Sequence, residues 1–155
     1  MKNYLFPYRY KLLGLFLFLI GLVLLLLSFF EIYLPDWEIP FPYITYEALF
    51  ADREFFVIKD LSLGVILPII IYIAGGLLYG FSEESQEDEL ISVVRKNSLV
   101  WAVYVNHIVL ILMLLFVGGF DFFGVIIISS FSLLLVFIIR FQWKKYQLKT
   151  ASDEE

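Results

Sequence analysis

The residues of this chain that could do chemistry are few, and they lie inside long apolar segments. The single histidine, His107, follows Asn106 near the middle of one uncharged run. Three serines lie at the corresponding depth of the next run, Ser129, Ser130 and Ser132. An imidazole among such groups could relay a proton or bind a ligand, because ionisable residues inside a membrane usually mark a function.

The same polar residues also have a purely structural interpretation. An unpaired polar group in hydrocarbon costs several kcal/mol, so these side chains should find partners. A hydrogen-bonded clamp between two helices uses the same residue types and contributes about 0.6–2 kcal/mol per bond. No Asp, Glu, Lys or Arg lies inside the uncharged runs, so a relay has no partner charge. We favour the clamp and keep the relay or ligand site as the alternative.

Catalysis and metal binding have little support in the composition. The chain has no cysteine, and one histidine cannot build a histidine-based metal site. A serine–histidine pair would lack the third group that orients the histidine of a nucleophilic site. Five acids after the second run could attract a divalent cation weakly, but a solvated acidic helix cap is the better interpretation. They are Glu83, Glu84, Glu87, Asp88 and Glu89. The sequence predicts a protein that is not an enzyme, with no cofactor and no metal.

Four uncharged runs set the architecture that would position the polar residues. They cover 12–30, 61–82, 97–120 and 122–139. Each is long enough to cross a hydrocarbon core of ~30 Å as a helix, which takes roughly 17–25 residues. Of the 155 residues, 61% are hydrophobic, against about 45–50% in a soluble domain. The prediction is an all-α membrane protein, a four-transmembrane-helix bundle forming a single domain.

The distribution of Lys and Arg predicts the orientation of this bundle. Three lie before the first run, two at 31–60, two at 82–96 and four after the last run. Placing both termini inside leaves nine basic residues inside and two outside, as the positive-inside rule requires. The expected arrangement is therefore a multi-pass membrane protein with both termini cytoplasmic.

The runs also give the expected boundaries. Membrane helices are predicted at 12–30, 61–81, 98–118 and 122–140, within a domain of residues 1–150. An extracytoplasmic loop at 31–60 and a cytoplasmic acidic linker at 82–97 join them, and 151–155 form a disordered tail. Ser85 with Asp88 is close to a capping box, so the third helix should begin near Gln86 and extend into the cytoplasm. The short link after the third helix makes it an antiparallel hairpin with the fourth.

Small residues mark the expected contacts between helices. Gly14, Gly21 and Ser28 recur every seven residues, which places them on one stripe of a helix. Gly76 and Gly80 form a small-xxx-small pair. Because lipid supplies no hydrophobic force between helices, close backbone approach at such residues is a main source of association. Chance placement of the glycines in the first stripe is the competing interpretation.

The segment at 31–60 combines prolines with many aromatic residues. Pro35, Pro40 and Pro42 exclude a regular helix over 35–42, and a short helix is expected over 46–52. Trp and Tyr favour the headgroup level of a membrane. We interpret the segment as a loop on the outer membrane surface, with a docking surface for a partner or ligand as the alternative.

The acidic linker carries a resemblance to known proteins. Its sequence from Asp88-Glu through Arg95-Lys96 to Ser98, just before a hairpinned membrane helix, resembles small four-pass bacterial membrane proteins of unknown function. Those proteins are often encoded beside helix-turn-helix regulators, and the chain through Arg140 also resembles uncharacterised four-helix proteins of the Bacteroidota. This chain lacks the Arg that usually follows the Asp-Glu pair. The resemblance implies a small protein of regulatory type in a bacterial inner membrane, and it transfers no catalytic residue.

Together these patterns predict an accessory or regulatory subunit that acts through protein–protein contacts. Its expected partners are the lipid bilayer and other membrane proteins or copies of itself, with no nucleic acid. The alternative is a small transporter or channel that uses the polar seam between the third and fourth helices.

Overall fold

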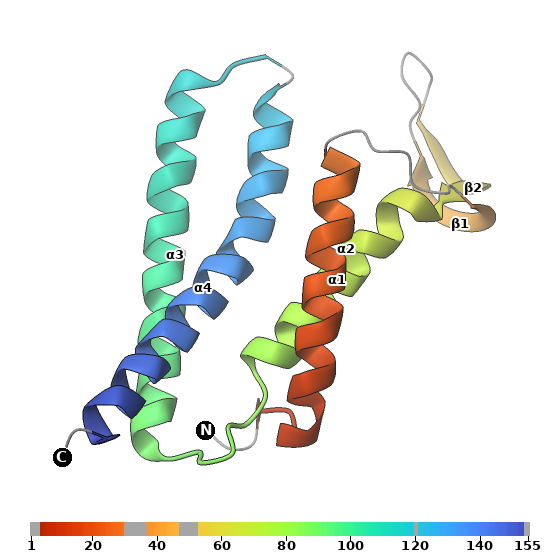
Figure 1. Ribbon diagram of the computed structural model, residues 1–155. Coiled ribbons are helices and arrows are strands. Elements are labelled where there is room, and N and C mark those ends of the chain that lie inside the picture. The colour runs from red at the N-terminus through yellow and green to blue at the C-terminus, as the bar shows by residue number, and fades with distance from the viewer. Residues whose placement is uncertain (1–3, 30–36, 47–52, 120, 154–155) are drawn as a thin grey trace.

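The computed structural model describes residues 4–29, 37–46, 53–119 and 121–153 of the chain. After a short 3-10 turn, η2 (Tyr8–Tyr10), come helix α1 (Lys11–Phe29) and strands β1 (Glu38–Tyr46) and β2 (Glu54–Ser62). Three helices follow, α2 (Leu63–Gly80), α3 (Glu89–Phe116) and α4 (Asp121–Asp153) (Figure 1). The described chain is therefore mostly helical, as predicted, but it is not all-α.

Within the described residues, three helical segments are long and apolar enough to cross a membrane. They are Tyr8–Ser28, Glu89–Phe116 and Phe123–Thr150, whereas α2 contributes a shorter apolar segment, Ile66–Gly80. Large apolar side chains face outward along these helices, among them Tyr104, Leu115 and Phe116, which are 65%, 73% and 84% exposed. Soluble monomers rarely expose such continuous apolar surface, so this distribution indicates membrane association.

The predicted loop at 31–60 contains an antiparallel β-hairpin. Strand β1 pairs with β2 in a register that sets Ile39 opposite Leu61 and Tyr43 opposite Val57, and β2 runs directly into α2. Pro40 and Pro42 lie within β1. They are tolerated there because they are two residues apart on an edge strand, so the N–H position of both can face away from β2. The short helix expected over 46–52 lies almost wholly outside the described residues, and Tyr46 belongs to β1.

Two helix boundaries differ from the predicted ones. Helix α3 begins at Glu89 instead of near Gln86, because Asp88 is its N-cap and its side chain accepts a hydrogen bond from the Ile91 N–H. Helix α4 continues through the basic, aromatic segment to Asp153 and does not end at 140. Residues 151–153, predicted as part of a disordered tail, are helical, while 154–155 lie outside the described residues.

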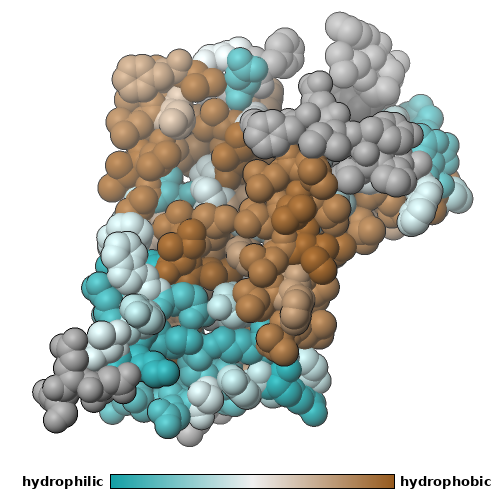
Figure 2. All heavy atoms as spheres, viewed as in Figure 1, coloured by the Kyte–Doolittle hydropathy of each residue, from teal (hydrophilic) through white to brown (hydrophobic). Residues whose placement is uncertain are grey.

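The helices form two antiparallel pairs, α1 with α2 and α3 with α4, which meet where α2 packs on α4 (Figure 1). The α2–α3 link, the start of α1 and the end of α4 lie at one end of the molecule, which we call the polar end. Hydrophilic residues gather there, and hydrophobic residues cover the helices above it (Figure 2). The hairpin and the α3–α4 turn lie at the opposite end (Figure 1).

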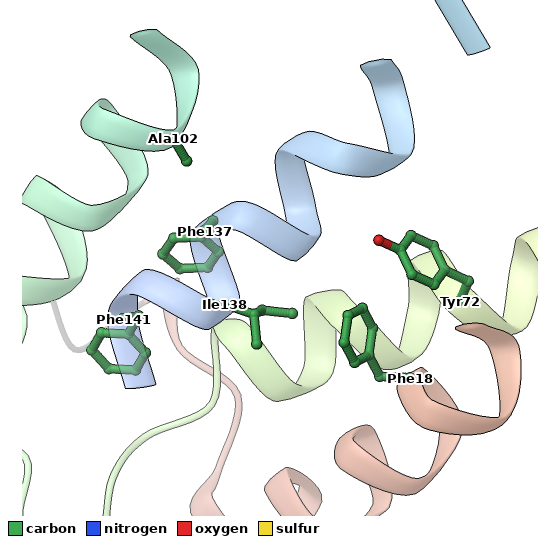
Figure 3. Close-up of a cluster of buried hydrophobic side chains, with 6 residues drawn as sticks. All are labelled: Phe18, Tyr72, Ala102, Phe137, Ile138 and Phe141. Atoms are coloured by element: carbon green, nitrogen blue, oxygen red, sulfur yellow. The ribbon is translucent and has the colours of Figure 1, made fainter. Parts of the chain in front are cut away.

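The buried core lies between the two helix pairs. Its members are Phe18, Tyr72, Ala102, Phe137, Ile138 and Phe141. In the close-up, Ile138 extends from α4 toward Phe18, whereas Phe137 lies on the side toward Ala102 (Figure 3). The ring of Tyr72 on α2 lies 5.6 Å from that of Phe131 on α4, so aromatic contacts contribute to the joint between the pairs.

Candidate functional site

The polar seam predicted between the third and fourth helices forms around Asn106. Its side-chain amide donates to Ser129 Oγ at 3.0 Å, and its carbonyl oxygen accepts a hydrogen bond from Ser132 Oγ. Asn106 is only 6% exposed. The tight α3–α4 turn, with Gly119 in the left-handed region at φ 71°, brings α4 back along α3. Asn106 on α3 therefore lies at the same level as Ser129 and Ser132 on α4. Asn106, Ser129 and Ser132 therefore form an interhelical hydrogen-bond clamp.

The other two predicted seam residues do not join the clamp. His107 is exposed on α3, and its Nδ1 lies 2.8 Å from the Val103 carbonyl oxygen one turn earlier. Ser130 is exposed on α4 and donates to the Ile126 carbonyl oxygen at 3.0 Å. Each polar side chain is thus bonded to the backbone of its own helix. The structure does not bring the histidine to the serines, so no relay is assembled from them.

The predicted stripe on the first helix is a helix contact at two of its three positions. Gly14 and Gly21 are buried where α1 crosses α2. A Cβ added at Gly14 would lie 2.6 Å from the Tyr79 backbone nitrogen, and one at Gly21 would overlap the Tyr72 backbone. Ser28, by contrast, is exposed at the far end of α1. The two glycines let the backbones of α1 and α2 approach closely, as small residues do in membranes.

The predicted pair on α2 faces α4. A Cβ at Gly80 would lie 2.7 Å from the Phe137 ring, and one at Gly76 would overlap Leu134. The neighbouring Gly75 was not selected from the sequence, yet it packs on the α1 backbone at Phe18. Consecutive residues of a helix point about 100° apart, so Gly75 and Gly76 serve different neighbours. Helix α2 is thereby the common partner of α1 and α4.

The polar end holds a network of ion pairs that the sequence did not reveal. The Glu84 carboxylate contacts Lys11 of α1, and Lys145 of α4 lies 3.1 Å from the same oxygen. Glu87 accepts two hydrogen bonds from the Arg95 guanidinium, at 2.7 and 3.0 Å. We call these three ion pairs the linker network. The sequence favours a solvated helix cap for these acids, but the side chains of Glu84 and Glu87 are only 8% and 11% exposed.

Arg95 is the most buried member of the linker network. It is 3% exposed, its guanidinium also donates to the Ser82 carbonyl oxygen at 3.1 Å, and its carbon lies 5.0 Å from the centre of the Phe141 ring. Burial by itself would raise the pKa of Glu87, but the hydrogen bonds from Arg95 and from the Glu84 backbone N–H outweigh it and lower that pKa. The Glu87 carboxylate is therefore ionised at neutral pH.

The N-terminal segment is hydrogen-bonded through its backbone to the α2–α3 link at the polar end. The Phe6 N–H donates to the Phe81 carbonyl oxygen, and the Glu83 N–H donates to the Phe6 carbonyl oxygen, each at 2.9 Å. A sequence signal for this network existed only in part. Glu87 and Arg95 lie in one linker, but Lys11 and Lys145 are distant in the chain, and no local pattern connects them to Glu84.

Two grooves flank these sites. An apolar groove of about 470 Å³ opens between α1, α2 and α4, and Ser28 and Ser132 line it together with leucine and isoleucine side chains. A polar groove of about 810 Å³ lies at the polar end, where Glu84, Gln142 and Lys145 are among its walls. Within the described ranges no three His, Asp or Glu side chains are grouped so as to hold a metal ion.

Comparison with known proteins gives no relative for this chain: no protein-family model, curated protein or solved structure matches it. The resemblance of the linker to small four-pass bacterial proteins therefore stays a prediction.

Proposed function

We propose that this chain is a small polytopic protein of a bacterial inner membrane that serves as a non-catalytic accessory or regulatory subunit. In this proposal α1, α2, α3 and α4 all cross the bilayer as a four-helix bundle. Helix α2 has 18 residues, about 27 Å at 1.5 Å per residue, close to the ~30 Å of a hydrocarbon core. The polar end then faces the cytoplasm with both termini, consistent with the excess of Lys and Arg there.

The observation that carries the proposal is the β-hairpin at the other end. Among the residues that the structure describes it has two strands, so each strand has an edge of backbone N–H and C=O groups that no other described strand pairs with. A two-stranded hairpin is at best marginally stable alone in water. Pairing with a strand of another chain, or packing on another protein, would complete it.

One face of the hairpin is apolar and exposed. Pro42 lies opposite Ile58, and Ile44, two residues after Pro42, extends the same face toward the tip, where Phe56 is also exposed. Ile44, Phe56 and Ile58 are 72%, 84% and 68% exposed. Phe56 also has φ of 52°, a conformation that bulky residues rarely adopt and that tends to occur at functional sites. This face is the surface at which we expect another membrane protein, or a second copy, to dock.

The alternative of a small transporter or channel rests on one observation. Ser132 of the clamp also lines the apolar groove between α1, α2 and α4, so the seam has an opening on one side. Against this, both ends of the Asn106 amide are already used by serines. The accessory role is therefore the better supported proposal.

Site-specific photo-crosslinking in native membranes tests the docking face. We expect a photoreactive residue at Ile44 or Ile58 to give one discrete cross-linked product, because these side chains are exposed on that face. The matched control is Leu61, which lies on the other face of β2 and is buried. Equal labelling from Leu61 and Ile58, or the absence of a discrete product from Ile44 and Ile58, would contradict the proposal.

A further inference from the structure

Two positive charges near the polar end of α4 have no carboxylate partner among the described residues. The Arg140 guanidinium stacks over the Trp101 ring, 3.9 Å from its centre, and Lys144 donates to Gln147 Oε1 at 3.0 Å. In the part of the chain that the structure describes, neither side chain forms an ion pair. The acids of the linker network pair with other cations, namely Lys11, Arg95 and Lys145. Two unneutralised charges therefore lie one helical turn apart on α4.

These charges line a shallow hollow at the surface. Its walls are Arg140, Trp143, Lys144 and Gln147, and its volume is about 170 Å³. Trp143 is exposed, and stacking on Trp101 holds the Arg140 guanidinium in place. Arg140 follows directly on the last uncharged run, so the hollow lies at the edge of the apolar surface. Tryptophan and arginine at this level are typical of a membrane interface.

An exposed apolar stripe leads away from the hollow along α3. The stripe begins at Trp101, on which the Arg140 guanidinium stacks, and continues at intervals of three or four residues. Its members are Trp101, Tyr104, Ile108, Ile111 and Leu115. Residues three and four apart lie on the same helix face, so the stripe is continuous. A charged hollow at the interface is thus joined to a track of apolar side chains at membrane depth.

We propose that the hollow formed by Arg140, Trp143, Lys144 and Gln147 binds the phosphate headgroup of an anionic phospholipid, with its acyl chains along the α3 stripe. Basic pockets beside membrane helices are known binding sites for anionic lipid headgroups. A zwitterionic lipid would bring an ammonium group toward the two cations, and a free phosphate would leave the stripe unused. The inference rests on the membrane-spanning arrangement proposed above, but not on the accessory role.

Tryptophan quenching by brominated lipids tests this site on the full chain. The protein carries Trp37→Phe, so that only Trp101 and Trp143 report, and is reconstituted in vesicles of phosphatidylcholine with dibrominated phosphatidylglycerol or dibrominated phosphatidylcholine. We expect the brominated anionic lipid to quench more strongly. The variant Arg140→Gln/Lys144→Gln should lose this preference by roughly fivefold per removed charge. Lys144→Gln alone, at an exposed position, should show half of the effect on a logarithmic scale.

The matched control is Lys96→Gln/Lys149→Gln, which removes the same charge from the same end away from the hollow and should keep the preference. Equal quenching by both lipids, equal losses in the two double variants, or relief of quenching by millimolar inorganic phosphate alone would overturn the proposal. Reconstitution itself reports separately on membrane insertion: a chain that does not enter the vesicles refutes the spanning arrangement, whereas an inserted chain without lipid preference refutes only the headgroup site.

Discussion

Asn106 gathers the intramembrane polar groups of α3 and α4 around one amide. Asparagine has a donor and an acceptor at the end of its side chain, so it can join two hydroxyl groups at once. Ser129 and Ser132 fill these roles from α4. His107, one residue later, points about 100° away and bonds to its own helix. One helical step therefore separates a clamp residue from a surface residue.

The clamp predicts a measurable coupling between two residues. In a double-mutant cycle, Asn106→Ala and Ser129→Ala should show a coupling free energy of about 0.6–1.7 kcal/mol, the range found for hydrogen bonds between membrane helices. Unfolding in mixed micelles of a mild detergent and dodecyl sulfate gives the free energies. The matched pair His107→Ala and Ser130→Ala should show no coupling, because each bonds its own helix; a coupling as large as that of the clamp would contradict the assignment.

The Glu87–Arg95 pair predicts an acid-dependent stability. The pKa of Glu87 is lowered below its ordinary value of 4.5, so the folded state favours the ionised carboxylate. The stabilisation is present above that ordinary value and is lost as pH falls through the lowered pKa. The midpoint temperature of thermal unfolding in detergent should therefore change little between pH 7 and 5 and should fall below about pH 4.5.

The variant Glu87→Gln isolates this contribution. It should lower the unfolding temperature at pH 7, because it leaves the buried Arg95 charge without its counter-ion. It should also flatten the acid limb of the profile. Asp88→Asn, an adjacent acid whose capping bond an amide oxygen can replace, is the control; an unchanged acid limb in Glu87→Gln would rule out this source of pH dependence.

At the scale of elements, α2 joins the others. Its glycines meet α1 on one side and α4 on the other, and the Tyr72 hydroxyl donates to the Phe131 carbonyl oxygen of α4 at 2.8 Å. The buried core lies along the same joint. A helix that must approach two neighbours this closely tolerates added volume poorly, because backbone atoms cannot rotate away.

This packing predicts a contrast between two glycines. Gly21→Ala should destabilise the protein by about 1–3 kcal/mol, the range for overpacking, since its Cβ would overlap the Tyr72 backbone. Gly124→Ala on α4 should be neutral or stabilise by up to about 1 kcal/mol, because a Cβ there meets no atom within 4 Å and alanine favours helix. Unfolding in mixed micelles measures both, and equal effects would show that the α1–α2 crossing is looser than described.

The sequence predicted the elements whose signal is local. Long uncharged runs identify apolar helices, and Gly14 and Gly21 identify one contact face. The sequence does not predict the hairpin, because Pro40 and Pro42 exclude a helix without indicating a strand, although an edge strand also accepts proline. The contacts of Glu84 were missed because its partners are distant in the chain. Depth along the helices predicts that Asn106 or His107 lies level with the α4 serines. It does not predict which of the two side chains forms hydrogen bonds with them.

At the scale of the whole molecule, two helix pairs are joined mainly toward the polar end. The linker network binds α1 and α4 to the α2–α3 link there, and the aromatic core lies just above it (Figures 1 and 3). Farther along, the apolar groove of about 470 Å³ separates α1 and α2 from α4. Glu84 is the one described side chain that forms ion pairs with both helix pairs, because Lys11 and Lys145 meet at the same carboxylate oxygen.

Removing the Glu84 charge should loosen the joint between the helix pairs. Without the carboxylate, Lys11 and Lys145 face each other as like charges at short range and repel. The chain has no cysteine, so spin labels can be attached at introduced cysteines alone, at the exposed positions Leu13 on α1 and Gln147 on α4. Pulsed electron–electron double resonance in lipid nanodiscs measures the distance between the two labels. It should give one narrow distance distribution in the parent protein and a broader distribution at longer distances in Glu84→Gln.

The control for this measurement is Glu83→Gln, one residue away. The Glu83 backbone bonds to Phe6, but its side chain forms no ion pair among the described residues, so the distance should stay narrow. High salt should mimic Glu84→Gln only in part, since partly buried pairs are screened less than exposed ones. If Glu84→Gln and Glu83→Gln give the same distribution, the aromatic core alone holds the two pairs together, and the linker network has no part in setting their separation.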